Sequence, residues 1–265
     1  MQPVPRLLLT DVVALARTAG DAILAVYAGE FGVARKSDDS PLTVADLRAQ
    51  AIIAAGLARL APGVPVISEE SPAPPLAERA RWEWLWLVDP LDGTREFVDR
   101  NGEFTVNIAL VHGQRPVLGV LHVPVSGVDY YACEGVGAFR QQGGGHAAPI
   151  AARPRIVGRP RVVASRSHRG AGLEGFFARI GAHELTAAGS AVKFALVAEG
   201  SADLYPRVGP TSEWDTAAGH AIATVAGAHV VGRDGQPLAY NARATLLNPD
   251  FVCYADESRP WHALL

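Results

Sequence analysis

Four acidic side chains of the sequence stand at the ends of expected secondary-structure elements, where a rigid scaffold can hold ligands. These acids are Glu69, Asp89, Asp92 and Asp215. The first three follow short apolar runs that are typical of strands, and the fourth stands at the start of a helical pattern. Functional groups are commonly carried on loops at such positions. We therefore take the four carboxylates as candidates for one shared site.

The segment from Asp89 to Thr94 reads Asp-Pro-Leu-Asp-Gly-Thr and carries two of these acids. Pro90 has a fixed φ and no N–H, and Gly93 lets the backbone approach another group closely. The two aspartates and the carbonyl of Leu91 can then converge on one point. Oxygen ligands of this kind suit a hard divalent cation such as Mg²⁺. For the hexapeptide alone, an ordinary surface turn is an equal alternative, because Asp, Pro and Gly are common in turns.

The elements that must position these acids begin with two helices. Apolar spacing predicts a helix over 12–27, with Thr10 or Asp11 as its N-cap. A second helix is expected from Thr43 to about residue 60, with Asp46 three residues after the cap. Short strands with short connections then predict an antiparallel sheet. Its strands are expected at 64–67, 84–88, 104–111, 117–123, 128–133 and 138–140.

A glycine-rich and proline-rich stretch at 141–160 marks a change of pattern. We place a domain boundary there, between an N-terminal α+β domain at 1–150 and a C-terminal α/β domain at 151–265 that contributes Asp215. Strands and helices alternate in the second domain. The strands are expected at 162–165, 184–186 and 202–205 and around Val230 and Phe251, and the helices at 171–180, 190–200 and 215–226.

The composition excludes several classes of protein. A chain of 265 residues with 49% hydrophobic and 19% charged residues is globular. Its net charge of -3 and pI near 6.2 give no basic face for a nucleic-acid polymer. The run Leu7-Leu8-Leu9 is too short for a signal peptide core or a membrane span. Cys133 and Cys253 lie in apolar runs and are expected to be reduced. We expect a cytoplasmic protein without an integral membrane segment.

Three separated motifs resemble the inositol monophosphatase family, the lithium-sensitive, metal-dependent phosphomonoesterases that include fructose-1,6-bisphosphatases. The motifs are Ser68-Glu69-Glu70, the run from Trp86 to Phe97, and Trp214-Asp215-Thr216-Ala217-Ala218-Gly219. The resemblance covers nearly the whole chain. It implies a layered α-β-α-β-α sandwich. Because the candidate residues come from both halves, the active site should lie between them.

The resemblance also implies a metal site and a mechanism. Glu69, Asp89 and the Leu91 carbonyl would bind one Mg²⁺, while Asp89, Asp92 and Asp215 would bind another, with two or three ions in all. The catalytic residues implied are Asp46, Thr94 and Glu69. A hydrogen bond between Asp46 and Thr94 would orient the attacking water, and the backbone N–H groups of Gly93 and Thr94 would hold phosphate oxygens. The alternative for Asp46 is a first-turn acid favoured by the helix dipole.

Within the family, the chain is most similar to the 3'(2'),5'-bisphosphate nucleotidases. The similarity includes the segments 36–41, 100–107, 165–168, 189–194 and 204–207, and also 235–238 and 247–249. It implies hydrolysis of adenosine 3',5'-bisphosphate, and of 3'-phosphoadenylyl sulfate, in sulfur metabolism. The substrate-binding residues implied are Gly93, Thr94, His168, Ser190, Lys193, Arg207 and Asp215.

Each of these substrate contacts has a structural alternative. Ser190 is a plausible helix N-cap, Lys193 a solvated charge and His168 a turn residue. For three aromatic residues, Tyr205, Trp214 and Phe194, core packing is favoured over stacking on a base. No role is assigned to His146, His220 and His229.

Two other functions stay open at this stage, namely hydrolysis of inositol monophosphate or fructose 1,6-bisphosphate, and a catalytically silent binding protein. The oligomeric state, monomer or homodimer, is also open.

Overall fold

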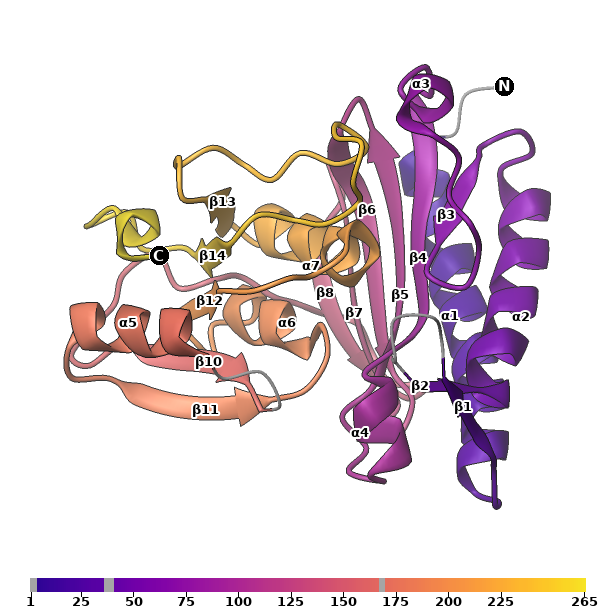
Figure 1. Cartoon of the computed structure of the whole chain (residues 1–265), viewed down its shortest axis with the longest axis horizontal. Helices are drawn as coiled ribbons and strands as arrows, with labels where there is room; N and C mark the ends of the chain where they lie inside the picture. Colours follow the sequence, from indigo (N-terminus) through magenta and orange to yellow (C-terminus); the bar gives the residue numbers. More distant parts are fainter. Residues whose placement is uncertain (1–3, 36–40, 167–169) are drawn as a thin grey trace.

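The computed structural model describes residues 4–35, 41–166 and 170–265, which fold into five alternating layers (Figure 1). Helices α1 (Pro5–Tyr27) and α2 (Val44–Leu60) cover one face of a seven-stranded sheet. Helices α6 (Val192–Ala198) and α7 (Glu213–Val225) lie between this sheet and a five-stranded sheet. Helix α5 (Ala171–Ile180) and a 3₁₀ turn, η1 (Trp261–Leu264), form the outermost layer. The α-β-α-β-α sandwich predicted from the sequence is confirmed.

The larger sheet has the order β3-β4-β5-β6-β7-β8-β9 and is antiparallel except for the β3–β4 pair. Its strands are β3 (Val66–Ser68), β4 (Trp84–Asp92), β5 (Thr105–His112), β6 (Arg115–Val123), β7 (Val128–Cys133), β8 (Gly137–Gln142) and β9 (Ala148–Pro149). Two-sided burial explains why β4 to β6 are nearly continuous apolar runs rather than alternating ones.

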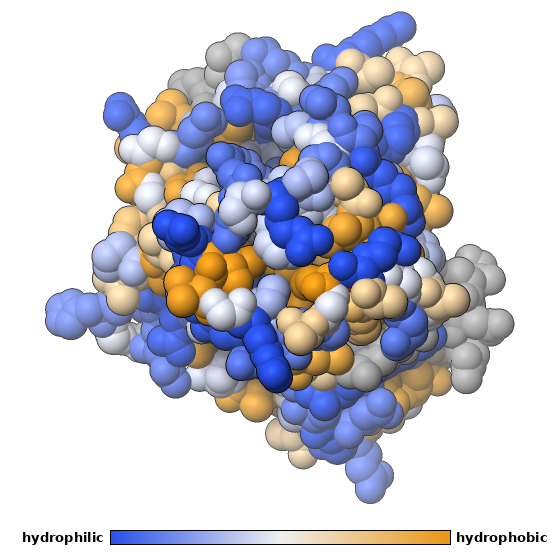
Figure 2. All heavy atoms as spheres, turned by 90° about the vertical axis from the view of Figure 1, so that its left-hand side faces the viewer, coloured by the Kyte–Doolittle hydropathy of each residue, from blue (hydrophilic) through white to orange (hydrophobic). Residues whose placement is uncertain are grey.

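The smaller sheet has the order β11-β10-β12-β14-β13. Its strands are β10 (Arg161–Ser165), β11 (Glu184–Ala188), β12 (Leu204–Arg207), β13 (His229–Gly232) and β14 (Phe251–Tyr254). Successive residues alternate between its faces, so that Val162 packs toward α5 while Val163 packs toward α6 and α7. Seen from the α5 side, the outer layer carries mainly hydrophilic side chains with smaller hydrophobic areas between them (Figure 2).

Two predicted helix starts were wrong for different reasons. Helix α1 begins at Pro5 rather than after Thr10, because proline is well suited to the first helical turn and the following leucines continue the helix. Helix α6 begins at Val192, since Ser190 has a left-handed backbone with φ of 41° and cannot act as its N-cap. By contrast, Thr43 caps α2 with Asp46 at the third helical position, as predicted.

Strand β4 continues past its predicted end at Val88 to Asp92. Pairing with β5 shifts register between Asp89 and Asp92, which marks a bulge, and a bulge tolerates the missing N–H of Pro90. The alternative that this segment is an ordinary surface turn was therefore wrong for Asp89 to Asp92. The chain turns at Gly93, with φ of 91°, and helix α4 (Thr94–Val98) begins there. Five other short elements of the described chain were not predicted: β1 (Val33–Arg35), β2 (Pro41–Thr43), α3 (Leu76–Arg79), β9 and η1.

The hydrophobic core extends across residue 150. One buried cluster contains Leu87 and Leu121 from the larger sheet together with Phe194, Ile222 and Phe251 from the C-terminal part of the chain. The division into domains at 1–150 and 151–265 stays a prediction. Within the described ranges, no helix is both long and apolar enough to cross a membrane.

Candidate active site

A cavity of about 280 Å³ is lined by residues from both halves of the chain. The lining includes most of the residues selected from the sequence. They are Glu69, Asp89, Leu91, Asp92, Gly93, Thr94, Ser190, Lys193, Arg207 and Asp215. Asp46 is not in the lining and reaches it through Thr94. His168 lies outside the described residues, as do residues 36–40 of the first motif.

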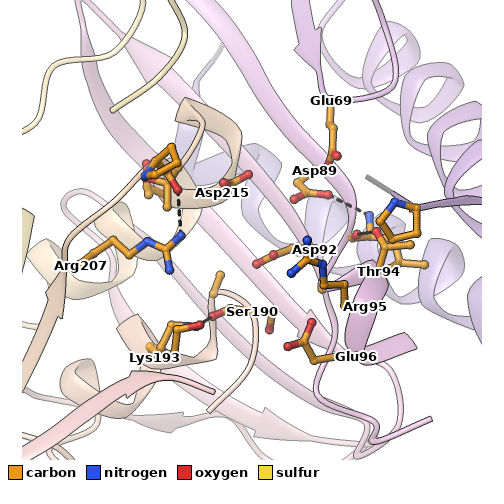
Figure 3. A pocket seen from close by; sticks show the side chains of 18 of the residues that line it. Glu69, Asp89, Asp92, Thr94, Arg95, Glu96, Ser190, Lys193, Arg207 and Asp215 are labelled. Atoms are coloured by element: carbon orange, nitrogen blue, oxygen red, sulfur yellow. Dashed lines mark hydrogen bonds between the residues drawn. The ribbon is translucent and has the colours of Figure 1, made fainter. Parts of the chain in front are cut away.

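The carboxylates of Glu69, Asp89 and Asp92 lie on one side of this cavity, and Asp215 faces them (Figure 3). The β4 bulge turns the end of this strand toward the cavity, where Leu91 N–H donates to Asp89 Oδ1 at 3.1 Å. On the neighbouring strand, Asn107 Nδ2 donates to Asp92 Oδ2 at 3.2 Å. Backbone and amide groups thus fix the two aspartates.

The acids repel one another in a poorly solvated place. Burial, followed by the charges of Glu69, Asp92 and Asp215, raises the pKa of Asp89 well above its usual range. Burial and the charge of Asp92 likewise raise the pKa of Asp215. Burial raises the pKa of Asp92 to about 6, although Lys193 acts in the opposite direction. Ionisation of all these acids together is therefore unfavourable unless a cation balances their charge.

This donor set fits a hard divalent cation by its chemistry. In the described parts of the chain, no three His, Cys, Asp or Glu side chains are already grouped as ligands of one metal ion. The available donors are nevertheless all oxygens, which is the ligand type of Mg²⁺. A dication would also offset the repulsion that raises the carboxylate pKa values.

Asp46 makes the contacts that both interpretations of it require, one with the helix start and one with Thr94. Its Oδ2 accepts from Thr43 N–H and from Thr43 Oγ1, each at 2.7 Å, so it caps α2. Its Oδ1 lies 3.5 Å from Thr94 Oγ1, the length of a weak hydrogen bond. Thr94 Oγ1 also lies within 3.3 Å of the Leu91 carbonyl oxygen. The helix cap thus holds Asp46, which is almost fully buried, beside Thr94.

Asp215 is also held in place by a capping box, at the start of helix α7. It occupies the third position of α7, and its Oδ2 accepts from Ser212 N–H at 2.9 Å. Helix α7 begins two residues earlier than predicted, and this puts Asp215 inside its first turn. Asn248 secures the turn, because its Nδ2 donates to the Ser212 carbonyl at 2.8 Å and to Thr216 Oγ1 at 2.9 Å.

Lys193 and Arg207 lie on the side of the cavity opposite Glu69 and Asp89, whereas Arg95 lies near Thr94 (Figure 3). Lys193 is only 4% exposed, so the alternative of a solvated charge was wrong. Burial lowers its pKa to about 8, and its Nζ donates to the carbonyls of Ala188 and Ser190. Arg207 Nη2 donates to the Pro210 carbonyl at 2.8 Å.

Two buried polar atoms of the cavity lining have no hydrogen-bond partner among the described residues. They are Ser190 Oγ and Arg207 Nε. An unsatisfied buried polar atom costs about 1–3 kcal/mol. Ser190 also holds an unusual left-handed conformation, and such strain is commonly found at functional sites. Both atoms are available to a ligand that carries hydrogen-bonding groups.

Sequence reasoning missed several lining residues. Arg95 and Glu96 follow the acidic motif directly, so adjacency was a signal that could have found them. The same signal applies to Thr216, which follows Asp215, and to Ser165, which begins the segment 165–168, whereas only the tertiary fold brings Pro210 and Thr211 to the cavity. Tyr205 lines the cavity too, but it is buried against Phe194 and Phe251, as the core-packing interpretation predicted.

The three unassigned histidines lie outside the cavity lining. His220 is buried, its Nδ1 is 3.0 Å from Tyr240 Oη, and burial lowers its pKa to about 3. His229 pairs with Glu257 at 2.7 Å, and His146 is exposed.

The five layers and the acid-lined cavity define a sandwich of the inositol monophosphatase type. The model of the inositol monophosphatase family matches residues 6–261. The 3'(2'),5'-bisphosphate nucleotidase CysQ of Salmonella typhimurium is 52% identical over 250 residues, which cover 92% of this chain and 98% of that protein. The CysQ of Escherichia coli K12 is 51% identical over the same length.

A solved structure agrees with these relatives. The crystal structure of CysQ from Bacteroides thetaiotaomicron, described as a bacterial member of the inositol monophosphatase family, has a TM-score of 0.82 and 42% identity. The alignment covers 93% of this chain and 96% of that one. The chain belongs to the inositol monophosphatase family.

Proposed function

We propose that the protein hydrolyses adenosine 3'(2'),5'-bisphosphate to AMP and phosphate, and that it also accepts 3'-phosphoadenylyl sulfate. The observation that carries this proposal is the division of the cavity into two sides. The carboxylates of Glu69, Asp89 and Asp92 lie on one side, and Ser190 Oγ and Arg207 Nε, which have no partner among the described residues, lie on the other. A substrate with two separated phosphates meets both sides. The relatives at 51–52% identity are named for this activity.

Mg²⁺ is the proposed cofactor, with two or three ions per site. Glu69, Asp89 and the Leu91 carbonyl would hold one ion, and Asp89, Asp92 and Asp215 would hold a second. When bound, Mg²⁺ supplies Lewis acidity that lowers the pKa of water and balances charge on the leaving oxygen.

The side chains around these ligands orient the reactants. Asp46 accepts the hydrogen bond of Thr94, and the hydroxyl oxygen of Thr94 then orients the attacking water by accepting a hydrogen bond from it. Backbone N–H groups at the start of α4, where Gly93 is the N-cap, face the phosphate that is cleaved. On the other side of the cavity, Arg207 and Lys193 bind the phosphate that stays on the product, and Ser190 binds the sugar. His168 keeps its proposed contact with the nucleotide.

The proposed setting is the cytoplasm, where adenosine 3',5'-bisphosphate is a small soluble substrate. The two free, buried cysteines, Cys133 and Cys253, agree with a reducing compartment.

The substrate is tested by a comparison of two phosphomonoesters with Mg²⁺. We expect kcat/KM for adenosine 3',5'-bisphosphate to exceed that for inositol 1-phosphate by about a hundredfold or more, because only the nucleotide carries a second phosphate for Arg207. Phosphate release at several substrate concentrations measures both constants. Equal or reversed values would contradict the nucleotidase and leave a phosphatase of another substrate class.

Metal binding is tested without activity, through its effect on stability. The folded-state pKa of Asp92 is raised from 3.8 to about 6, so the folded protein binds more protons than the unfolded chain between these values. The contribution of Asp92 to stability is therefore present below about pH 4 and is lost as the pH rises through 6. We expect Mg²⁺ to raise the melting temperature more at pH 7.5 than at pH 5.5, because only the ionised acids bind it well.

Thermal unfolding with and without Mg²⁺ at the two pH values measures this difference. The effect of His220, whose lowered pKa destabilises the fold at acid pH, is present with and without the ion and cancels. A gain that is absent, or equal at both pH values, would exclude these carboxylates as Mg²⁺ ligands.

A further inference from the structure

Three segments that are distant in the sequence meet at the carboxylate of Glu103. Arg166 donates to it twice, from Nη2 to Oε1 at 2.6 Å and from Nε to Oε2 at 3.2 Å. Gly189 N–H donates to Oε2 at 2.8 Å. Arg166 Nη2 also lies 3.3 Å from the Ala187 carbonyl oxygen. We call these four residues, Glu103, Arg166, Ala187 and Gly189, the Glu103 junction.

Each segment of the Glu103 junction leads directly into the cavity. Glu103 stands between α4 and β5, four residues before Asn107, which donates to Asp92. Arg166 follows Ser165, a lining residue at the end of β10. Gly189 precedes Ser190. The junction therefore joins the acidic side of the cavity to the side that is proposed to select the nucleotide.

The approach of these backbones is too close for a side chain at position 189. A Cβ atom on Gly189 would lie 2.7 Å from the Glu103 carbonyl oxygen and 2.9 Å from the Glu103 Cβ. These contacts involve the backbone and the first side-chain carbon, which cannot swing away as the end of a long side chain can. The loop at 187–190 thus rests directly on Glu103.

Ser190 is held from both sides of its strained conformation. On its N-terminal side, the Gly189 N–H is bound by Glu103, and on its C-terminal side, Lys193 Nζ donates to the Ser190 carbonyl. A left-handed residue other than glycine persists only when its surroundings fix it. Loss of either interaction releases Ser190 toward ordinary backbone angles and moves its Oγ away from the cavity.

Stability alone gives little reason for the Glu103 junction. The side chains of Arg166 and Glu103 are 50% and 34% exposed, and solvent screens ion pairs of such exposure, so that this pair contributes little to folding. The Glu103 carboxylate has a clearer effect on the positions of the loops, because Arg166 and Gly189, from two different segments beside the cavity, both donate to it.

We propose that Glu103 is a positioning residue for substrate selection. It fixes the loop that carries Ser190 and the end of β10 against the acidic side of the cavity, and it is not itself part of the cavity lining. This inference rests on the proposed function, since it concerns the side of the cavity that binds the nucleotide beyond its reacting phosphate.

The test compares Glu103→Ala and Glu103→Gln with the wild-type enzyme on adenosine 3',5'-bisphosphate and on p-nitrophenyl phosphate, which has no second phosphate or sugar. For Glu103→Ala we expect KM of the nucleotide to rise about tenfold. We expect kcat for the nucleotide, and both kcat and KM for the aryl phosphate, to stay within about threefold of the wild-type values. The Gln variant retains an acceptor for Gly189 N–H and should show a smaller rise in KM.

Asp203→Asn is the matched control. Asp203 also accepts a backbone N–H, from Arg161, and two bonds from the guanidinium of Arg161, but it does so at the start of β10, away from the cavity. We expect this variant to lower the melting temperature and to leave the ratio of the two substrates unchanged.

Equal losses on both substrates, an unchanged KM in Glu103→Ala, or the same rise in KM in Asp203→Asn would overturn the positioning role. If the wild-type enzyme itself shows no preference for adenosine 3',5'-bisphosphate over inositol 1-phosphate, the proposed function fails first and this inference fails with it. The two failures are thus distinguished by the wild-type protein.

Discussion

Replacement of Asp92 by asparagine is expected to lower kcat by about a thousandfold or more, the largest effect on activity that we expect of a single change. Asparagine has nearly the same size and can still accept the hydrogen bond of Asn107. The substitution removes only the negative charge of the carboxylate. This charge would hold the Mg²⁺ ion that balances charge on the leaving oxygen. Phosphate release at saturating substrate and Mg²⁺ measures the effect.

The fold should survive the Asp92→Asn substitution. Because burial raises the pKa of Asp92 to about 6, its charge destabilises the metal-free protein at pH 7.5, and removing that charge should not lower the melting temperature. Asp99→Asn is the control, since Asp99 is an exposed acid that follows α4 and does not line the cavity. Wild-type activity in Asp92→Asn would show that the acidic cluster is not the reaction centre.

Substitution of Gly119 by alanine is expected to destabilise the protein by about 2–3 kcal/mol, the largest effect on folding that we predict. Gly119 lies on β6, where a Cβ would stand 2.3 Å from the Ala218 carbonyl oxygen and 2.9 Å from the Ala221 Cβ, both on α7. Helix α7 must move away from the sheet to admit this methyl group. Equilibrium unfolding in urea measures the loss.

Gly144→Ala is the control for Gly119→Ala, because a Cβ at position 144 meets no atom within 4 Å. Its free energy of unfolding should stay within about 0.5 kcal/mol of the wild-type value. Since α7 carries Asp215, the Gly119 variant should also bind Mg²⁺ more weakly. Equal stabilities of the two variants would show that α7 does not pack directly on β6.

The local signals in the sequence were sufficient for the acidic side of the cavity. The pattern of apolar residues correctly predicted most of the strands and helix α5. The capping box of Thr43 correctly predicted the start of α2. Asp89, Asp92 and Asp215 were selected from their places beside such elements, and the structure brings them to one cavity. In these segments, interactions between residues close in the sequence determine the local structure.

The other side of the cavity depends on contacts that are distant in the sequence. From the sequence alone, Lys193 could equally be a solvated surface residue. Its burial is evident only in the fold, where Nζ lies 5.4 Å from the centre of the Tyr205 ring. From the sequence, Ser190 is a plausible helix cap. In the fold, Glu103 binds the neighbouring Gly189 N–H and Lys193 binds the Ser190 carbonyl, and the backbone of Ser190 is left-handed. Similarly, pairing with β5 carries β4 past Pro90, which local preferences alone would have made a turn.

The two helix caps at Asp46 and Asp215 have a consequence for how the reaction centre is assembled. Each acid already accepts a backbone N–H bond that forms when its helix folds, so these two side chains are ordered before ligands arrive. The conformational entropy of these two side chains is lost once, when the chain folds, and not again in each catalytic cycle. The centre is therefore preorganised, and much of its affinity for ligands is determined by the start of two helices.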